Sequence, residues 1–511
     1  MAQQLQSINL VAPAFKGINT EDSPLTQDPS FAEVADNAVI DKRGRIAARK
    51  GNDVLTTDKT ALGTDSINGI HQYRDDEGNK VVFSVGNNKI FTGTTTLTEQ
   101  TLGSYTITDN NWKMVTFNGH AYFFQRGHEP LVYQGVVTPP DTPVVEPMTT
   151  HAHFHGPAPH ANEVLAAYGR LWAADFENDK STVYWSRLLI GHDWGGTGSG
   201  SIDISDVWPD GYDEIVALAA HNNHLLIFGK HSIVVYQNAT SPANMSLADT
   251  ISGIGCVDRD TVQYTGTDVI FLSQTGLKSF GRTIQEKSMP ISSLSGSITR
   301  DLLDAISEED EGYSSVYSPE NNFYLLTFQS QDLTYCFDVR GTLENGSYRV
   351  TRWPFTGFKC YERLDNGVLY VGSSEGIGQY SGYSDNGNSY KFSYFSPSLT
   401  FGDPSRVKLL KKLRPTLIGG RDTSTTLSWA YDFDESYNTA TVVVGRGAES
   451  ALFGSALYGV SKFTGGVKTS RTAVNTTGGG GTIVIGVEAD INGKQLSLQE
   501  INVLALMGKV I

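Results

Sequence analysis

Short apolar runs separated by polar turns recur between about residue 65 and residue 383. Each unit has an apolar segment, a polar turn of two or three residues and an aromatic-rich segment, which is typical of a β-hairpin. The units begin at Ile70, Met114, Val164, Ile215, Val262, Val316 and Tyr361. About seven units therefore follow one another at intervals of roughly 45–55 residues, the period of propeller blades.

The turns between the paired segments support this interpretation. Asn118-Gly119 and Asn366-Gly367 provide residue types that tolerate the positive φ of a tight hairpin. A single two-stranded hairpin is marginally stable, so the units must bury their faces against one another. We therefore expect an all-β protein whose residues 65–388 form a β-propeller-like body of about seven irregular repeats. A large irregular β-sandwich assembly is the alternative, because WD dipeptides and kelch double glycines do not recur at fixed offsets.

The two ends of the chain have a different character. Residues 1–64 predict an N-terminal arm that includes a hairpin, with apolar positions at 39–40 and 46–48 around a turn at 41–44. Residues 389–511 predict a C-terminal β-sandwich-like domain, with strands expected at 406–415, 425–432, 482–487 and 501–507. The clearest helical pattern is short, at 298–307, with Leu302, Leu303 and Ile306 on one side.

Two segments interrupt the repeats. Residues 134–162 are rich in proline and histidine, and residues 192–212 combine two tryptophans and several glycines with carboxylates that include Asp203, Asp206 and Asp210. Proline-rich segments do not enter the interior of a sheet. Insertions in regular repeats usually lie on one face and meet partners, so we expect both segments to be loop insertions with contacts to other proteins.

Composition narrows the function classes. The 511 residues include 53 glycines, 10% aromatic and 18% charged residues, as in turn-rich β proteins of two to four domains. A net charge of −16 argues against a surface built to grip nucleic acid. The three cysteines have no CxxC spacing, so we expect neither a disulfide scaffold nor a zinc finger. The N-terminus lacks a signal-peptide pattern and no apolar run reaches membrane-spanning length.

Catalytic signatures are not convincing. Residues 372–376 match the glycine-flanked serine of a nucleophile elbow, but a turn leading into another strand is expected there instead of a helix. We therefore predict no enzymatic activity and no cofactor. Metal binding is also not expected. Its one candidate set is His151, His153 and His155, whose alternate spacing would direct three imidazoles to one side of an extended segment. A solvated loop is the favoured interpretation of these histidines.

The N-terminal segment resembles the tail tubular (nozzle) proteins of short-tailed phages and the related packaged-DNA stabilisation proteins. The resemblance covers about 40 residues, and beyond them it is one of organisation. The matching positions are Phe15, Gly17, Ile18, Leu25, Ala32, Asn37, Asp41, Gly44, Ile46, Arg49 and Gly51. In this family a sandwich domain follows the propeller, as expected here.

The resemblance implies a structural virion protein, made in the host cytoplasm, that forms a tail nozzle ring. This ring is expected to be a homohexamer below a tail adaptor ring, in contact with tail fibres or a plug or needle protein. It would retain packaged DNA and conduct it through the lumen at infection, without sequence-specific binding, because lumen carboxylates repel the polyanion.

Candidate subunit contacts come from the arm, the insertions and a basic strand. They are Phe15, Ile18, Arg45, Arg49, Trp194, Trp208, Arg406, Lys408, Lys411 and Lys412. The alternative for the basic strand is that its charged side chains only face solvent and contact no other subunit. The alternative function is a tail module that binds or depolymerises host glycans, with Trp194, Trp208 and Tyr212 stacking on sugars.

Overall fold

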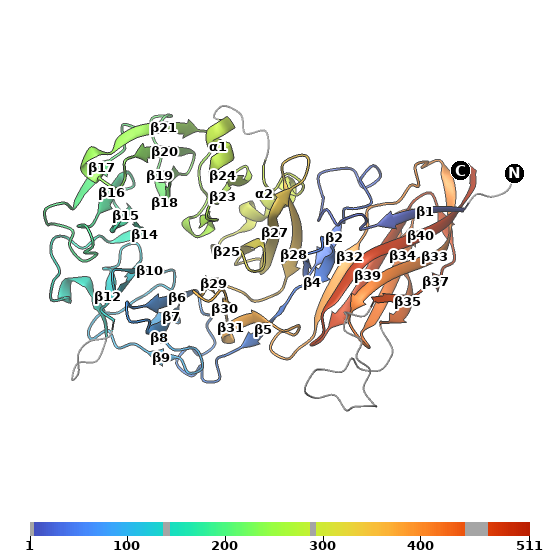
Figure 1. Cartoon of the computed structure of the whole chain (residues 1–511), viewed down its shortest axis with the longest axis horizontal. Helices are drawn as coiled ribbons and strands as arrows, with labels where there is room; N and C mark the ends of the chain where they lie inside the picture. Colours follow the sequence, from blue (N-terminus) through green and yellow to red (C-terminus); the bar gives the residue numbers. More distant parts are fainter. Residues whose placement is uncertain (1–4, 136–143, 287–292, 445–468, 511) are drawn as a thin grey trace.

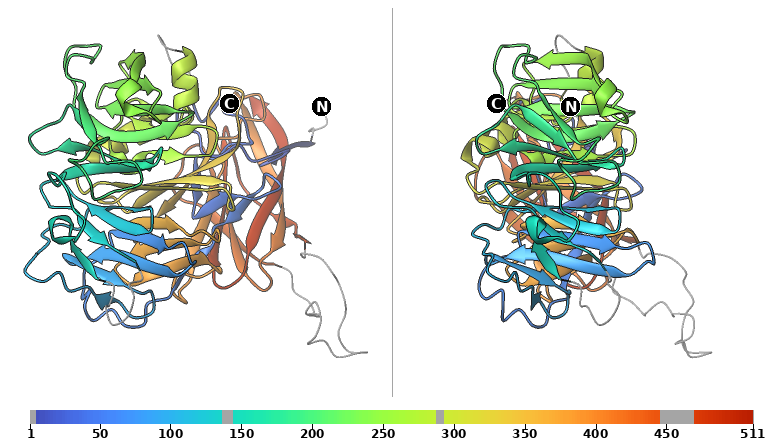
Figure 2. Two further views of the ribbon diagram at one scale, coloured as in Figure 1. Left: turned by 60° about the vertical axis from the view of Figure 1, so that its left-hand side comes forward. Right: turned by 90° about the vertical axis from the view of Figure 1, so that its left-hand side faces the viewer.

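The computed structural model describes residues 5–135, 144–286, 293–444 and 469–510, and it divides into two β structures side by side (Figure 1). One is a β-propeller and the other is a sandwich of two sheets. The turned view in Figure 2 (left) shows that blue N-terminal strands lie among the red C-terminal strands of the sandwich. The all-β fold with a propeller and a C-terminal β-sheet domain is thus confirmed.

Six blades of the propeller have four strands and a seventh unit has three. The first two blades are β6 (Gly69–Arg74), β7 (Lys80–Gly86), β8 (Lys89–Thr92) and β9 (Thr98–Glu99), then β10 (Lys113–Phe117), β11 (His120–Phe124), β12 (Leu131–Tyr133) and β13 (Val145–Pro147). The next two are β14 (Ala161–Ala167), β15 (Arg170–Phe176), β16 (Thr182–Trp185) and β17 (Gly200–Asp203), then β18 (Ile215–His221), β19 (His224–Gly229), β20 (Ser232–Gln237) and β21 (Ser246–Ser252).

The three-stranded unit comes fifth along the chain, and two further blades complete the ring. Their strands are β22 (Gln263–Tyr264), β23 (Val269–Ser273) and β24 (Gly276–Ser279), then β25 (Tyr313–Ser318), β26 (Phe323–Phe328), β27 (Leu333–Thr342) and β28 (Tyr348–Pro354), and finally β29 (Cys360–Arg363), β30 (Leu369–Ser373) and β31 (Gly376–Ser381). The outer strand of the last blade is β5 (Gly51–Val54), which pairs antiparallel with β31. The N-terminal segment therefore closes the final blade.

Tight turns with positive φ join the hairpins, as the sequence predicts. Asn118 (φ 45°) and Gly119 (φ 78°) connect β10 to β11, and Asn222 (φ 46°) and Asn223 (φ 63°) connect β18 to β19. Consecutive positive φ values match the right-handed twist of the flanking strands. Because successive side chains alternate between faces, each blade then presents apolar faces to both neighbours.

The sandwich contains strands from both ends of the chain. One sheet has β1 (Leu5–Leu10), β3 (Ala38–Ile40), β4 (Ile46–Ala48), β33 (Arg406–Gly419), β36 (Thr469–Arg471), β37 (Val474–Asn475), β38 (Gly479–Gly480) and β40 (Leu496–Val510). The other has β2 (Val34–Asp36), β32 (Tyr390–Phe395), β34 (Ser424–Tyr431), β35 (Asn438–Val443) and β39 (Ile483–Ile491). Residues 1–64, expected to form one arm, are thus divided between the sandwich and the last blade.

Strand β2 joins the two structures. It lies between β28 of the propeller and β32 of the sandwich, so a single nine-stranded sheet runs through both. A continuous apolar core follows this sheet, with Phe337 on the propeller side and Tyr394 and Val487 on the sandwich side. The two structures therefore share backbone hydrogen bonds and buried apolar area, which fixes their relative orientation.

Helices are few among the described residues. The α-helices are α1 (Phe280–Glu286) and α2 (Thr299–Glu308), and the 3-10 turns are η1 (Met148–Thr150), η2 (Pro242–Asn244) and η3 (Arg259–Thr261). The pattern at 298–307 correctly predicts α2, whose Leu302 is buried. Within the described ranges, neither α-helix has the length and apolarity needed to cross a membrane.

Both expected insertions lie at the outer edges of blades. Strand β13 falls in the 134–162 segment and β17 in the 192–212 segment, and each is the last strand of its sheet. Residues 136–143 of the first insertion lie outside the described residues. Residues 372–376 form the turn from β30 to β31, as expected of a turn serine and not of a nucleophile elbow.

Candidate functional site

The N-terminal motif lies at the junction of propeller and sandwich, where Arg49 is its most buried charge (1% exposed). The Arg49 guanidinium donates to both carboxylate oxygens of Asp385 (2.9 and 2.6 Å), to the Asn37 side chain (2.9 Å) and to the Lys50 carbonyl (2.9 Å). It also lies over the Tyr390 ring, 4.2 Å from the centroid. Burial alone would lower the Arg49 pKa, but the Asp385 carboxylate outweighs it and the pKa is raised.

At other motif positions, close backbone contacts or a positive φ favour the residue type that is present. A Cβ on Gly51 would lie 1.9 Å from the Ser384 carbonyl oxygen, and one on Gly17 would lie 2.6 Å from the Val350 nitrogen. Asn37 has φ 51°, and its amide donates to the Lys391 carbonyl (2.8 Å). These residues let the N-terminal segment pass close to both the propeller and the sandwich.

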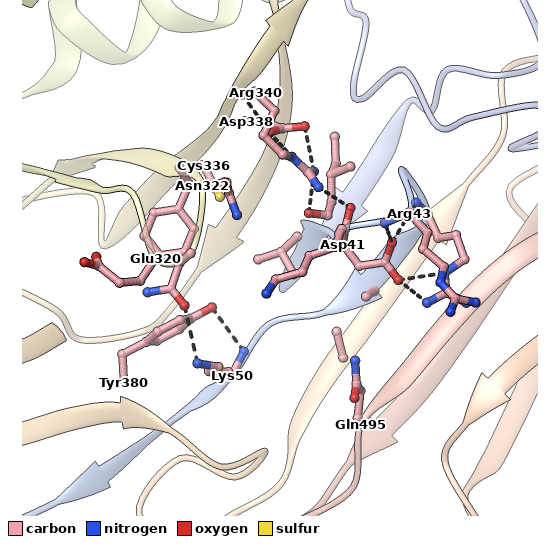
Figure 3. A pocket seen from close by; sticks show the side chains of 18 of the residues that line it. Asp41, Arg43, Lys50, Glu320, Asn322, Cys336, Asp338, Arg340, Tyr380 and Gln495 are labelled. Atoms are coloured by element: carbon pink, nitrogen blue, oxygen red, sulfur yellow. Dashed lines mark hydrogen bonds and ion pairs between the residues drawn. The ribbon is translucent and has the colours of Figure 1, made fainter. Parts of the chain in front are cut away.

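A cavity of about 430 Å³ opens beside this junction (Figure 3). The β3–β4 hairpin forms one wall, and Asp338 and Arg340 of β27 form another. Arg340 is paired with Asp338 (2.7 Å) and donates to the Ile40 carbonyl (2.8 Å). Lys50 donates its backbone N–H to the Tyr380 hydroxyl (3.1 Å). The charges of the walls are thus largely paired within the chain.

Two cationic side chains at the rim of this cavity are not paired within the described part of the chain. Lys42 and Arg43, in the turn between β3 and β4, are exposed, and their side chains have no hydrogen-bond or ion-pair partner among the described residues. Asp41 accepts from the Arg43 backbone N–H (2.8 Å) and pairs with the Arg45 side chain, which holds the turn in place. The hairpin therefore presents two free positive charges on a rigid turn.

A second charged group occupies the axis of the propeller, where inner strands of several blades converge on another cavity of about 430 Å³. Lys113 lies 3.6 Å from Glu163 and 3.5 Å from Asp260, and Arg259 lies 3.3 Å from Asp260. Burial raises the pKa of Glu163 to about 7 and that of Asp258 to about 6. For Asp260, the cations Arg259 and Lys113 outweigh burial and lower the pKa.

The axial group ties blades together. The Arg259 guanidinium donates to the backbone carbonyls of Asn162, in β14, and Asn111 (3.0 Å), before β10. Arg259 in the fifth unit thus donates to backbone carbonyls of the second and third blades, so three units of the propeller share one buried cation. Perturbed carboxylates in a cavity are found at catalytic sites, but here every one of them faces a cation that also holds backbone.

A third polar group consists of histidines. His120, His151 and His192 each offer one nitrogen, and these nitrogens all lie within 4.8 Å of one another. Desolvation and the neighbouring imidazoles lower the pKa of His192 to about 4 and also lower that of His151. The rings of His151 and His192 are therefore neutral near pH 7.

This grouping corrects the candidate set His151, His153 and His155. Only His151 belongs to it, because η1 and a turn closed by the Phe154 N–H to the His151 carbonyl (3.0 Å) replace the expected extended segment. Side chains two residues apart then do not share a direction. His153 is exposed, and His155 is paired with Asp193 (3.1 Å). His120 and His192, both remote in sequence, were missed.

Most candidate contact residues are buried within this chain. Phe15, Ile18, Trp194 and Trp208 are at most 8% exposed, and Arg45 and Arg49 are paired internally. Lys408 is fully buried and donates to the Gly481 carbonyl (2.6 Å). Arg406 and Lys411 on β33 are exposed and Lys412 is half-buried. These three remain predictions as contacts to another subunit.

Comparisons with known proteins found structural neighbours of low sequence identity. No family model and no curated protein matches the chain. Among solved structures, the chain is similar to the WD40 propeller of Doa1 (13% identity, TM-score 0.34, 65% of this chain and 96% of that one). It is also similar to the WD40 domain of Neurospora crassa Pan2 (10% identity, TM-score 0.36, 66% and 97%). An extracellular domain of a B. thetaiotaomicron one-component system matches at 12% identity and TM-score 0.37, over 66% of this chain and 40% of that one.

Proposed function

We propose that this chain is a structural, non-enzymatic subunit of a phage tail nozzle, assembled as a homohexameric ring that retains packaged DNA and conducts it during ejection. The observation that supports the proposal best is that residues of the N-terminal motif connect the propeller to the sandwich. Its glycines, asparagine and arginine hold the propeller and sandwich in one fixed orientation. A ring that must keep a constant bore needs such a rigid subunit.

The charge distribution is consistent with this role. The chain carries a net charge of −16, so a lumen formed by it repels DNA phosphates and lets the polyanion slide. Exposed cations remain on β33 and on the β3–β4 turn, where Arg406, Lys411, Lys42 and Arg43 lie. On an acidic protein such basic patches are suited to an acidic surface of the next subunit or of the adaptor ring.

The glycan-binding alternative has less support. Two of its three stacking residues, Trp194 and Trp208, are 8% and 4% exposed, whereas Tyr212 is 69% exposed. One exposed ring does not form a stacking platform for a sugar chain. We therefore propose a single function.

Native mass spectrometry of the purified chain, alone and with the tail adaptor protein, tests the proposal. We expect six copies per ring, either spontaneously or on the adaptor. A chain that stays monomeric or trimeric in both conditions contradicts the nozzle proposal, and binding to host polysaccharide in the same sample would support the alternative.

Charge reversal tests the surfaces. Lys411→Glu and Arg43→Glu are expected to reduce the hexamer fraction at a given concentration without changing the melting temperature, because both side chains are exposed. Lys89→Glu, in the first blade, is a control with the same change in charge, and since it also breaks an ion pair with Glu99 its melting temperature is measured alongside. Equal loss of hexamer in all three variants would indicate a general charge effect instead of defined contacts.

A further inference from the structure

Three imidazoles from separate segments converge beside the second and third blades. His120 begins β11, His151 follows η1 in the first insertion, and His192 lies between β16 and β17 in the second. The rings of His151 and His192 are 4.4 Å apart between centroids, and the His120 ring is within 5.6 Å of both. Beneath them the two blades share an apolar core that contains Tyr122, Met148 and Trp194.

Each ring uses its Nδ1 atom in a hydrogen bond. His120 Nδ1 is 3.0 Å from the Asn118 carbonyl oxygen, to which it donates. His151 Nδ1 accepts from the His153 backbone N–H (3.3 Å), and His192 Nδ1 is bonded to the Tyr122 hydroxyl (3.3 Å). A ligating histidine donates its other ring N–H, as His120 Nδ1 does here, and this orients the ring and leaves Nε2 free to bind. The long bond from the His153 N–H instead puts the proton of neutral His151 on Nε2, so coordination through this atom requires the other tautomer, with the proton on Nδ1, and gives up that bond.

The buried member of the cluster has no partner for this atom. His151 is 5% exposed, and its Nε2 is buried without a hydrogen-bond partner among the described residues. A buried polar atom without a partner is costly, and in native proteins it usually marks a bound water, an ion or a functional role. Here the groups nearest to it are two more imidazole nitrogens, which cannot all donate to one another.

We propose that His120, His151 and His192 bind one divalent transition-metal ion of the zinc class through their Nε2 atoms. With Zn–N bonds of about 2.0–2.1 Å, tetrahedral ligand nitrogens stand about 3.4 Å apart. Nitrogens that already lie within 4.8 Å of one another reach this separation by small rotations of the rings. Imidazole favours zinc, copper or nickel over magnesium or calcium, which prefer oxygen ligands.

The fourth ligand of this site is water. His153 is exposed and its ring centroid is 6.0 Å from that of His151, outside the group of convergent nitrogens. Two carboxylates, Glu146 and Asp193, act electrostatically on His151 and His192 and favour a cation there. The ion joins both insertions to the β11 edge, so it fixes the segments that sequence analysis assigned to partner contacts.

Titration of Zn²⁺ into chelator-treated full-length protein tests the site. We expect one ion per chain by isothermal titration calorimetry, and Co²⁺ as a spectroscopic probe should give the intense visible absorption of a tetrahedral site. His120→Ala and His192→Ala should each weaken binding by more than the roughly 10- to 100-fold that loss of an outer-shell partner costs. Both residues are only half-buried, so these variants should fold, which circular dichroism verifies.

His153→Ala and His155→Ala are the matched controls, and their affinity should equal that of the parent chain. If these variants lose binding to the same extent as His151→Ala, the ligands are the histidines of the first insertion. That result would overturn the proposed ligand set. No saturable binding at millimolar Zn²⁺, or binding that survives in His120→Ala and His192→Ala, would also overturn it. None of these outcomes depends on ring assembly, so the site and the proposed function are tested separately.

Discussion

Two buried polar groups of this molecule are built in opposite ways. At the junction of propeller and sandwich, Arg49 donates to Asp385, to Asn37 and to backbone, and it stacks on Tyr390. Beside the second and third blades, three histidine nitrogens converge and the buried one has no partner. A buried polar group whose hydrogen bonds are all made within the chain has a structural role. A buried polar atom without a partner indicates a missing ligand, which we propose is a metal ion.

Removal of the junction cation should have the largest effect. We expect Arg49→Ala to lower the free energy of unfolding by about 3–5 kcal/mol, because it leaves the Lys50 carbonyl and the Asn37 and Asp385 side chains without their donor. Urea denaturation measures this. The control is Arg363→Ala, which removes an exposed pair with Glu320 and should cost under about 1 kcal/mol. Similar losses in both variants would contradict the junction's role.

Added volume at the junction should have the next largest effect. Gly51→Ala places a methyl group 1.9 Å from a backbone oxygen, so we expect a loss of about 3 kcal/mol and a lower melting temperature. Gly341→Ala is the matched control, because nothing lies within 4 Å of its Cβ position and its φ is not positive. Its melting temperature should change little.

At the histidine group, we expect the binding of a metal ion to raise the stability of the native state. Zn²⁺ at a hundredfold excess over its dissociation constant should stabilise the native state by about 2.7 kcal/mol. Differential scanning fluorimetry should therefore show a rise in melting temperature that EDTA reverses. The His192→Ala variant should show no such rise, and an equal rise in that variant would point to ions bound elsewhere.

The charged group at the propeller axis should make the free energy of unfolding depend on pH. The pKa of Glu163 rises from 4.5 to about 7 on folding, so the folded protein keeps a proton that the unfolded chain loses. This group's contribution to stability therefore falls as the pH rises from about 4.5 to 7. Compared with the parent, Glu163→Gln should gain about 2 kcal/mol between pH 5 and pH 8 in urea titrations. A constant difference across this range would contradict the raised pKa.

Local patterns in the amino-acid sequence specify the repeated unit. Alternating apolar positions and the asparagine and glycine turns, such as 118–119, specify hairpins through local backbone preferences, and their period indicates a propeller. The short amphipathic pattern at 298–307 specifies α2 in the same way. The N-terminal motif was also visible, because its glycines and Arg49 stand at recognisable spacings.

Contacts between residues remote in sequence arise from the packing of whole sheets. Arg49 pairs with Asp385, β5 completes the last blade, and β2 joins two structures through one sheet. The spacing of His151, His153 and His155 indicated a common direction, but a local turn removed it and brought His120 and His192 close instead. Local propensity acts over a few residues. Contacts between blades and across the sandwich depend on how whole sheets bury their apolar faces, which no short stretch of sequence encodes.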